Sequence, residues 1–82
     1  MQNKETVEFE TQTRVIISGK NDIGNNIKIS ENVDKVEYTN YRKEESDGFT
    51  GYLDGKKQFS VLFSNVTDIG SYLQDELQSF SM

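Results

Sequence analysis

The strongest constraint on the fold is an alternation of apolar and polar residues along residues 6–18. Every second position is apolar or a threonine, and the opposite parity is polar from Glu8 to Arg14, with Ile16 as the one break. The predicted inward face holds Val7, Phe9, Thr11, Thr13, Val15 and Ile17. A period of two is typical of a strand with one buried face. The segment therefore predicts a half-buried antiparallel strand.

Shorter segments with the same period follow, and turn-forming Gly, Asn and Asp residues separate them. The expected strands cover residues 27–30, 35–43, 49–53 and 57–63. In the third strand along the chain, Val36, Tyr38 and Asn40 are expected to share one face.

The dipeptide Asp54-Gly55 predicts a β-hairpin between the last two of these strands. A two-residue loop would pair Leu53 with Lys56 and separate Phe49 from the face of the next strand's apolar residues. A three-residue loop with a G1 bulge would instead align Phe49 with Phe59, Val61 and Phe63. The three-residue loop is expected, because a slip of one residue would expose a whole apolar set.

The C-terminal residues 65–80 predict a helix, because their apolar residues recur at steps of three and four. Asn65 or Thr67 can cap this helix, and Asp68 lies in its first turn, where an anion is favoured. The apolar stripe is Val66, Ile69, Leu73, Leu77 and Phe80. The expected fold is therefore α+β, a four- to five-stranded antiparallel β-sheet with one C-terminal α-helix packed on one face. Residues 1–5 are expected to be a frayed N-terminus, and residues 6–82 a single small domain.

The residue types exclude most kinds of catalysis and metal binding. The 82 residues include no histidine and no cysteine, so the usual general base, the common nucleophile pairs and thiolate metal sites are missing. No glycine-rich phosphate loop is present. Asp22, Asn25 and Asn26 could offer oxygen ligands to calcium, but the EF-hand spacing is absent and a turn explains them better. We expect no enzyme activity, no metal and no cofactor.

The charge balance restricts the partner. The chain has 14 acidic and 9 basic residues and a net charge of −5. This weighs against direct binding of nucleic acid or of an anionic membrane, and it favours a protein with a basic surface. No apolar run approaches the roughly 20 residues of a membrane-spanning helix, and no signal peptide follows Met1. A cytoplasmic location is expected, which would be the host cytoplasm for a phage-encoded protein.

Four acidic groups recur along the chain and can be read either as solvated surface or as contact residues. They are Glu5, Glu8 and Glu10; Glu31, Asp34 and Glu37; Glu44, Glu45 and Asp47; and Asp68, Asp75 and Glu76. Carboxylates on a rigid scaffold can imitate spaced phosphates and occupy a basic, nucleic-acid-binding surface. Exposed tyrosines beside them would add contact area at low entropy cost.

The leading hypothesis is a small acidic protein that acts stoichiometrically as an inhibitor or regulator of a partner with a basic surface. The partner-binding residues expected are Tyr41, Glu44, Glu45, Asp47, Tyr52, Asp68, Asp75 and Glu76. In size, acidity and composition the chain resembles small phage-encoded inhibitors of host proteins, without a shared motif. The alternative is a structural or assembly subunit that self-associates through a sheet edge. The oligomeric state does not follow from the sequence.

Overall fold

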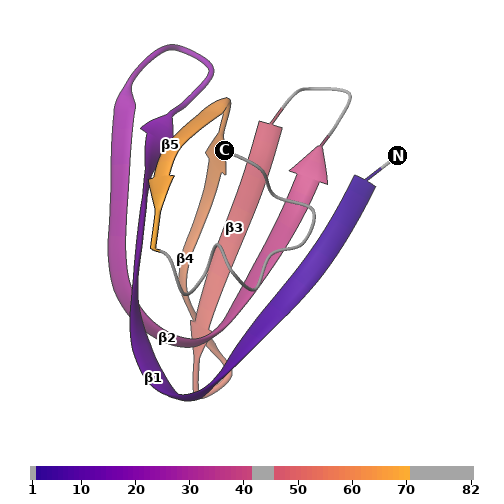
Figure 1. Cartoon of the computed structure of the whole chain (residues 1–82), viewed down its shortest axis with the longest axis vertical. Helices are drawn as coiled ribbons and strands as arrows, with labels where there is room; N and C mark the ends of the chain where they lie inside the picture. Colours follow the sequence, from indigo (N-terminus) through magenta and orange to yellow (C-terminus); the bar gives the residue numbers. More distant parts are fainter. Residues whose placement is uncertain (1, 42–45, 71–82) are drawn as a thin grey trace.

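One antiparallel sheet makes up the computed structural model, which describes residues 2–41 and 46–70. Its strands are β1 (Gln2–Lys20), β2 (Asn26–Tyr41), β3 (Ser46–Leu53), β4 (Lys56–Phe63) and β5 (Asn65–Ile69). The strands lie in the order β4-β3-β2-β1-β5 (Figure 1). The first four strands therefore form a meander, and the fifth pairs with the first.

The two long strands, β1 and β2, bend sharply at the same place (Figure 1). Glu8 pairs with Lys35 and Thr13 pairs with Val33, so residues 9–12 of β1 stand opposite Asp34 alone. Extra residues on one strand of a pair bend the ladder and increase its twist. The bend divides the sheet into two arms. The first arm continues into β3 and β4, and the second arm carries β5.

The sheet curls so that its two edge strands, β4 and β5, can follow one another directly in the chain. Ser64 is the single residue between β4 and β5, and its N–H donates to the carbonyl of Lys20, 2.8 Å away. Gly19 makes this approach possible, because a Cβ there would lie 2.4 Å from the carbonyl oxygen of Asn65. The result is a half-barrel whose concave face is the core.

The core confirms the inward face predicted for β1 at Val7, Val15 and Ile17, which are buried. Thr11, predicted on the same face, is exposed, because it lies among the residues that bulge out at the bend. The buried apolar residues are Val7, Val15, Ile17, Val33, Val36, Tyr38, Phe49, Phe59, Phe63 and Ile69. On β2 the inward parity changes between Val33 and Val36, a step of three residues that coincides with the bend.

The β3–β4 hairpin corrects the predicted three-residue loop. Leu53 pairs with Lys56, and both Asp54 and Gly55 have positive φ, 52° and 78°. This is the geometry of a two-residue type I′ turn. A bulge restores the expected faces, because Tyr52 pairs with Lys57 but Gly51 pairs with Phe59. Phe49 therefore shares the inner face with the apolar residues of β4, as predicted, although the slip occurs in the strand and not in the loop.

The predicted α+β class is wrong for the part of the chain that the structure describes, which is all-β. Residues 65–69, expected to begin the helix, form β5 and pair with the end of β1. Ser18 pairs with Asp68 and Gly19 with Val66, so Thr67 is an extra residue in β5. This bulge turns both Val66 and Ile69 towards the core, and a strand thereby acquires the three-residue step of a helix.

The rest of the predicted helix, with Leu73, Leu77 and Phe80, lies outside the described residues. Among the residues that are described, no helix has the length and hydropathy needed to cross a membrane. The predicted domain boundary at Thr6 stays a prediction.

Replacing Gly19 by alanine should destabilise the fold through the closure of the half-barrel. The new methyl group would meet the Asn65 carbonyl at 2.4 Å and the Phe63 ring at 2.7 Å, and a backbone atom cannot rotate away. We expect Gly19→Ala to lower the free energy of unfolding by about 2 kcal/mol, measured by urea denaturation.

Gly48→Ala is the matched control. Its methyl group would meet the side chain of Tyr41 at 3.1 Å, and this ring can shift. The control should change stability by less than about 1 kcal/mol. Equal losses for the two variants would contradict the tight packing of β5 against Gly19.

Candidate functional site

A hollow of about 550 Å³ lies where the bend of β1 meets the tip of the β3–β4 hairpin. We call it the acidic hollow. Four of its lining residues are carboxylates and three have large apolar or aromatic side chains. The lining is Glu8, Phe9, Glu10, Thr11, Gln12, Asp34, Lys35, Tyr52, Leu53, Asp54 and Gly55.

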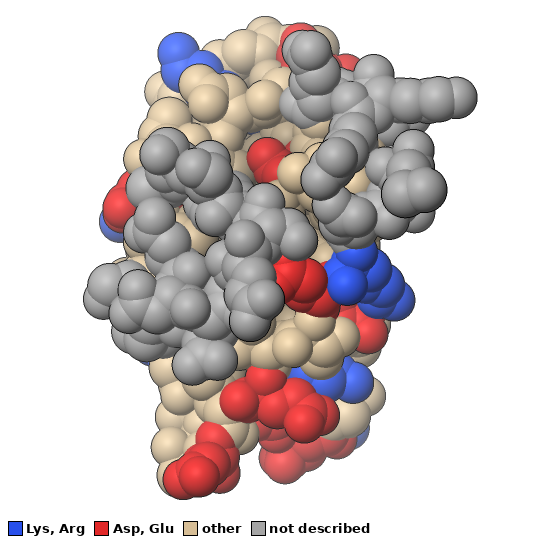
Figure 2. Space-filling model, turned by 45° about the vertical axis from the view of Figure 1, so that its right-hand side comes forward, with Lys and Arg blue, Asp and Glu red and all other residues tan. Residues whose placement is uncertain are grey.

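The carboxylates of the acidic hollow come from three separate elements. Glu8 and Glu10 are on the bent part of β1, Asp34 is on β2, and Asp54 is in the hairpin turn. The Oδ2 atom of Asp34 accepts a hydrogen bond from the backbone N–H of Asp54, at 3.1 Å. This bond ties the turn to the bend, so the carboxylates are held on one side of the molecule. Figure 2 shows acidic side chains gathered at the lower end of the molecule, which is the end where β1 and β2 bend in Figure 1.

These four carboxylates have no ion-pair partner among the described residues. The ion pair that the described chain contains joins Lys4 and Glu37, at 3.8 Å, and no described Lys or Arg lies within 4.0 Å of a carboxylate of the hollow. Lys35 is the one cation that lines the hollow, and its Nζ lies 4.8 Å from the centre of the Tyr52 ring. Lys35 therefore reduces the negative potential without cancelling it.

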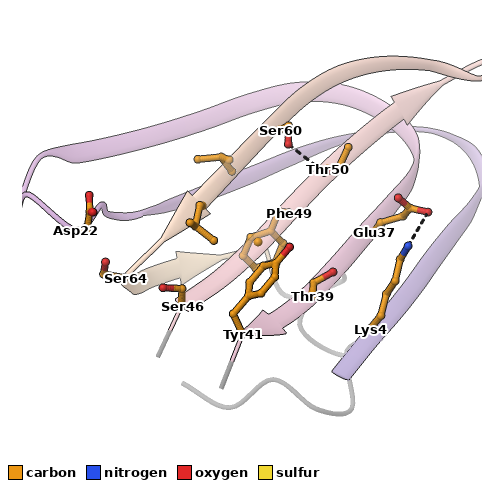
Figure 3. A pocket seen from close by; sticks show the side chains of 13 residues that line it. Lys4, Asp22, Glu37, Thr39, Tyr41, Ser46, Phe49, Thr50, Ser60 and Ser64 are labelled. Carbon is orange, nitrogen blue, oxygen red and sulfur yellow. Dashed lines mark hydrogen bonds and ion pairs between the residues drawn. The ribbon is translucent and has the colours of Figure 1, made fainter. Parts of the chain in front are cut away.

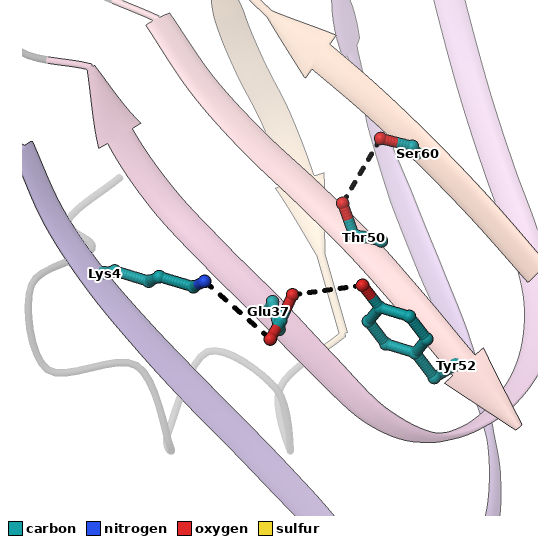
Figure 4. A network of polar contacts seen from close by, with 5 residues as sticks. All are labelled: Lys4, Glu37, Thr50, Tyr52 and Ser60. Carbon is teal, nitrogen blue, oxygen red and sulfur yellow. Dashed lines mark hydrogen bonds and ion pairs between the residues drawn. The ribbon is translucent and has the colours of Figure 1, made fainter. Parts of the chain in front are cut away.

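Tyr52 forms the aromatic wall of the hollow and is fixed by polar contacts on the outer face (Figure 4). Its hydroxyl donates to Oε1 of Glu37 at 3.2 Å, and Lys4 reaches Oε2 of the same carboxylate. Partial desolvation, with the bond to Glu37 and its charge, raises the pKa of Tyr52. Thr50 of the same strand and Ser60 of β4 share a hydroxyl contact of 3.2 Å. The ring is thus held in place, and the Lys35 ammonium already makes a cation–π contact with it.

A larger groove of about 910 Å³ crosses the convex side of the first arm (Figure 3). We call it the outer groove. Hydroxyl groups from three neighbouring strands predominate in it, and Asp22 and Lys4 stand at its two ends. Its lining is Lys4, Asp22, Glu37, Thr39, Tyr41, Ser46, Gly48, Phe49, Thr50, Ser60, Val61, Leu62 and Ser64. Few of its side chains are charged, so the outer groove lacks the strong potential of the acidic hollow.

The structure separates the partner-binding residues that the sequence predicted. Tyr52 lines the acidic hollow, whereas Tyr41 lines the outer groove. Asp68 is exposed on β5 opposite Ser18, away from both, and Asp47 pairs with Phe63 on the inner face. The other four predicted contacts lie outside the described residues: Glu44, Glu45, Asp75 and Glu76.

Sequence reasoning missed the combination that forms the acidic hollow. Glu8 and Glu10 were assigned to one group and Asp34 to another, while Asp54 was read only as a turn residue. The bend that brings them together depends on four residues of β1 opposing one residue of β2. No local sequence pattern indicates this mismatch. It becomes visible only when the pairing of β1 with β2 is known.

Asp47 has an internal partner. Its Oδ1 atom accepts a hydrogen bond of 2.5 Å from the hydroxyl of fully buried Tyr38, and Asn40 donates to the same hydroxyl at 3.2 Å. Burial raises the pKa of Tyr38 well above its ordinary value, and the hydrogen bond to Asp47 and the charge of Asp47 add to the shift. This cluster joins β2 to β3 inside the half-barrel, so we assign it a structural role.

No protein-family model, curated protein or solved structure matches this chain. Within residues 2–41 and 46–70, no group of three or more Asp or Glu residues is arranged to hold a metal ion. The arguments for function therefore come from the geometry and charge of the two concave surfaces.

The buried Tyr38 should make the fold sensitive to alkali. Its raised folded-state pKa stabilises the protein fully below the ordinary tyrosine value of about 10, and this stabilisation is lost as the pH rises above it. The free energy of unfolding should then fall by up to about 1.4 kcal/mol per pH unit. Urea denaturation from pH 7 to pH ~11.5 measures the slope.

Tyr38→Phe separates this effect from the titration of other groups. The variant should lose about 1–3 kcal/mol near neutral pH, because Asp47 and Asn40 lose a buried partner. Its stability should nevertheless decline less steeply above pH ~10 than that of the unmodified protein. Parallel slopes for the two proteins would show that Tyr38 does not titrate in a buried environment.

Proposed function

We propose that the protein is a small binding protein that acts stoichiometrically as an inhibitor or regulator of a partner with a basic surface. The acidic hollow receives a lysine- or arginine-rich segment of that partner. The observation that carries this proposal is the convergence of Glu8, Glu10, Asp34 and Asp54 around one hollow without an ion-pair partner among the described residues.

Several weak attractions combine at such a site. Each exposed charge pair contributes about 0.2–1 kcal/mol, so four carboxylates together can select a cationic segment that one alone could not. The side chains of Tyr52 and Leu53 add an apolar wall against which the stems of lysine or arginine can pack. The concentrated negative potential also speeds the association with a basic surface.

The position of the charges favours a short basic segment as the ligand. Imitation of a nucleic-acid strand requires negative groups spaced along an extended surface, because phosphates are regularly spaced. The unpaired carboxylates described above surround a single hollow instead. We therefore infer that the partner inserts a few cationic side chains, and that any nucleic-acid site of the partner is blocked as a consequence.

Neutralising the acidic hollow should weaken binding to a short oligolysine peptide. The variant Glu8→Gln, Glu10→Gln, Asp54→Asn changes the net charge from −5 to −2, and asparagine tolerates the positive φ of residue 54. We expect the dissociation constant to rise at least about tenfold in isothermal titration calorimetry at low salt. For the unmodified protein, affinity should fall as the ionic strength rises to about 1 M, where screening acts over about 3 Å.

The control carries the same change of net charge at exposed acids outside the hollow: Asp22→Asn, Glu31→Gln, Asp68→Asn. It should bind oligolysine several times more tightly than the variant in the hollow, because only the general attraction is reduced. Equal weakening by the two triple variants would show that the peptide senses net charge alone and would reject the acidic hollow as a site.

A further inference from the structure

Among the described residues, the backbone of β4 has a pairing partner along one side only. β4 is the last strand on one side of the sheet, and its pairing partner β3 occupies only the other side. The backbone hydrogen bonds of the described residues outside the strand ladders involve none of Phe59–Phe63. Every second residue of an edge strand directs its N–H and C=O groups outward, so this edge offers a template for another strand.

The side chains of β4 do little to protect this edge. Charges that discourage pairing occur only at its start, in Lys56 and Lys57, whereas the following residues are uncharged. Leu62 is 53% exposed, and among the described residues only Ile23 is another large apolar side chain with comparable exposure. The opposite edge strand, β5, is only five residues long, contains a bulge and carries exposed Asp68. Short, bulged and charged strands are protected against pairing.

A second exposed apolar residue, Ile23, lies near the C-terminal end of β4, the end that contains Leu62. Asp22 of the β1–β2 turn lines the outer groove together with Leu62 and Ser64. The next residue, Ile23, is 74% exposed. Its backbone N–H and that of Asn25 both donate to the side-chain oxygen of Asn21, at 3.1 and 2.9 Å. The turn is therefore held by its own hydrogen bonds while its isoleucine faces solvent.

We propose that β4 pairs with β4 of a second copy of this chain, antiparallel and across a two-fold axis. Such an arrangement places the Lys56–Lys57 end of one strand beside the Ser64 end of the other, where Asp22 lies. Asp22 and Lys56 form no ion pair within the described part of one chain, so both charges are available to the neighbour. A strand with a lysine at its start and the carboxylate of Asp22 near its end can pair these charges with a second copy of itself, as a two-fold interface requires.

The pairing joins two five-stranded sheets into one continuous sheet and brings the apolar Leu62 and Ile23 of both copies towards the interface. It leaves the acidic hollow accessible, because the hollow is lined from the bend and the hairpin tip, with no residue of Phe59–Phe63. A partner-binding protein and a dimer are therefore compatible, and each can be tested without the other.

Sedimentation velocity over a concentration series measures the association directly. The unmodified protein should shift from 9.4 kDa towards twice that mass as its concentration rises. Ser60→Lys puts like charges opposite one another near the middle of the paired strands and should raise the dimer dissociation constant at least about tenfold. A protein that stays monomeric at millimolar concentration would overturn the proposal.

Two controls isolate the edge from general effects. Ser60→Ala removes the same hydroxyl contact with Thr50 but adds no charge, so it should dimerise like the unmodified protein. Thr67→Lys adds the same charge at an exposed position on β5, the opposite edge, and should also leave the dimer intact. Loss of the dimer in Thr67→Lys but not in Ser60→Lys would reject β4 as the interface.

A charge exchange tests the antiparallel direction. Lys56→Glu and Asp22→Lys, taken singly, should each weaken the dimer several-fold, and the double variant should recover most of the loss. Single effects that add without recovery would show that the two residues do not face each other and would overturn the antiparallel arrangement. No ligand is present in these measurements, so their outcome is independent of oligolysine binding.

Discussion

The bend shared by β1 and β2 is the constraint on which the rest of the structure depends. Between Glu8 and Thr13 the first strand contains more residues than the second can pair, so the ladder turns and the sheet folds over itself. The apolar faces of the two arms then form one core from a single sheet. Without this turn, a flat five-stranded sheet would leave the apolar face in water, a state that a domain of this size could not stabilise.

The same bend creates the acidic hollow. Where β1 bulges away from β2, space is left on the outer side of the sheet. The β3–β4 hairpin ends at this space, because the Asp34 side chain binds the backbone N–H of Asp54. Core formation and the gathering of carboxylates thus have one geometric cause. Repulsion among the carboxylates is tolerated there because they are exposed to solvent, where the effective dielectric constant is high.

The sequence was informative where the period was regular and misleading where a bulge intervened. The inner face of β1 could be predicted at Val7, Val15 and Ile17, because these residues keep the same parity on both sides of the bend. The start of β5 could not, since its bulge at Thr67 gives Val66 and Ile69 the spacing of a helix. The hairpin shows the same limit, because the need to bury Phe59 was recognised but the slip lies in β4 and not in the loop. Of the predicted contact residues, only Tyr52 lies at the hollow. Its carboxylates, among them Glu8, Asp34 and Asp54, could not be grouped from the sequence, because only long-range strand pairing makes them neighbours.

The direct connection of the two sheet edges through Ser64 also determines the order in which the fold can assemble. The meander from β1 to β4 forms from hairpins, each between strands that follow one another in the chain. Pairing of Ile17 with Ile69 instead joins distant parts of the chain. Its entropic cost of loop closure is large until the meander from β1 to β4 has formed and brought the two residues together. We therefore expect β5 to dock onto a nearly complete half-barrel, and a nascent chain that ends before Ser64 to present β1 as a second unpaired edge.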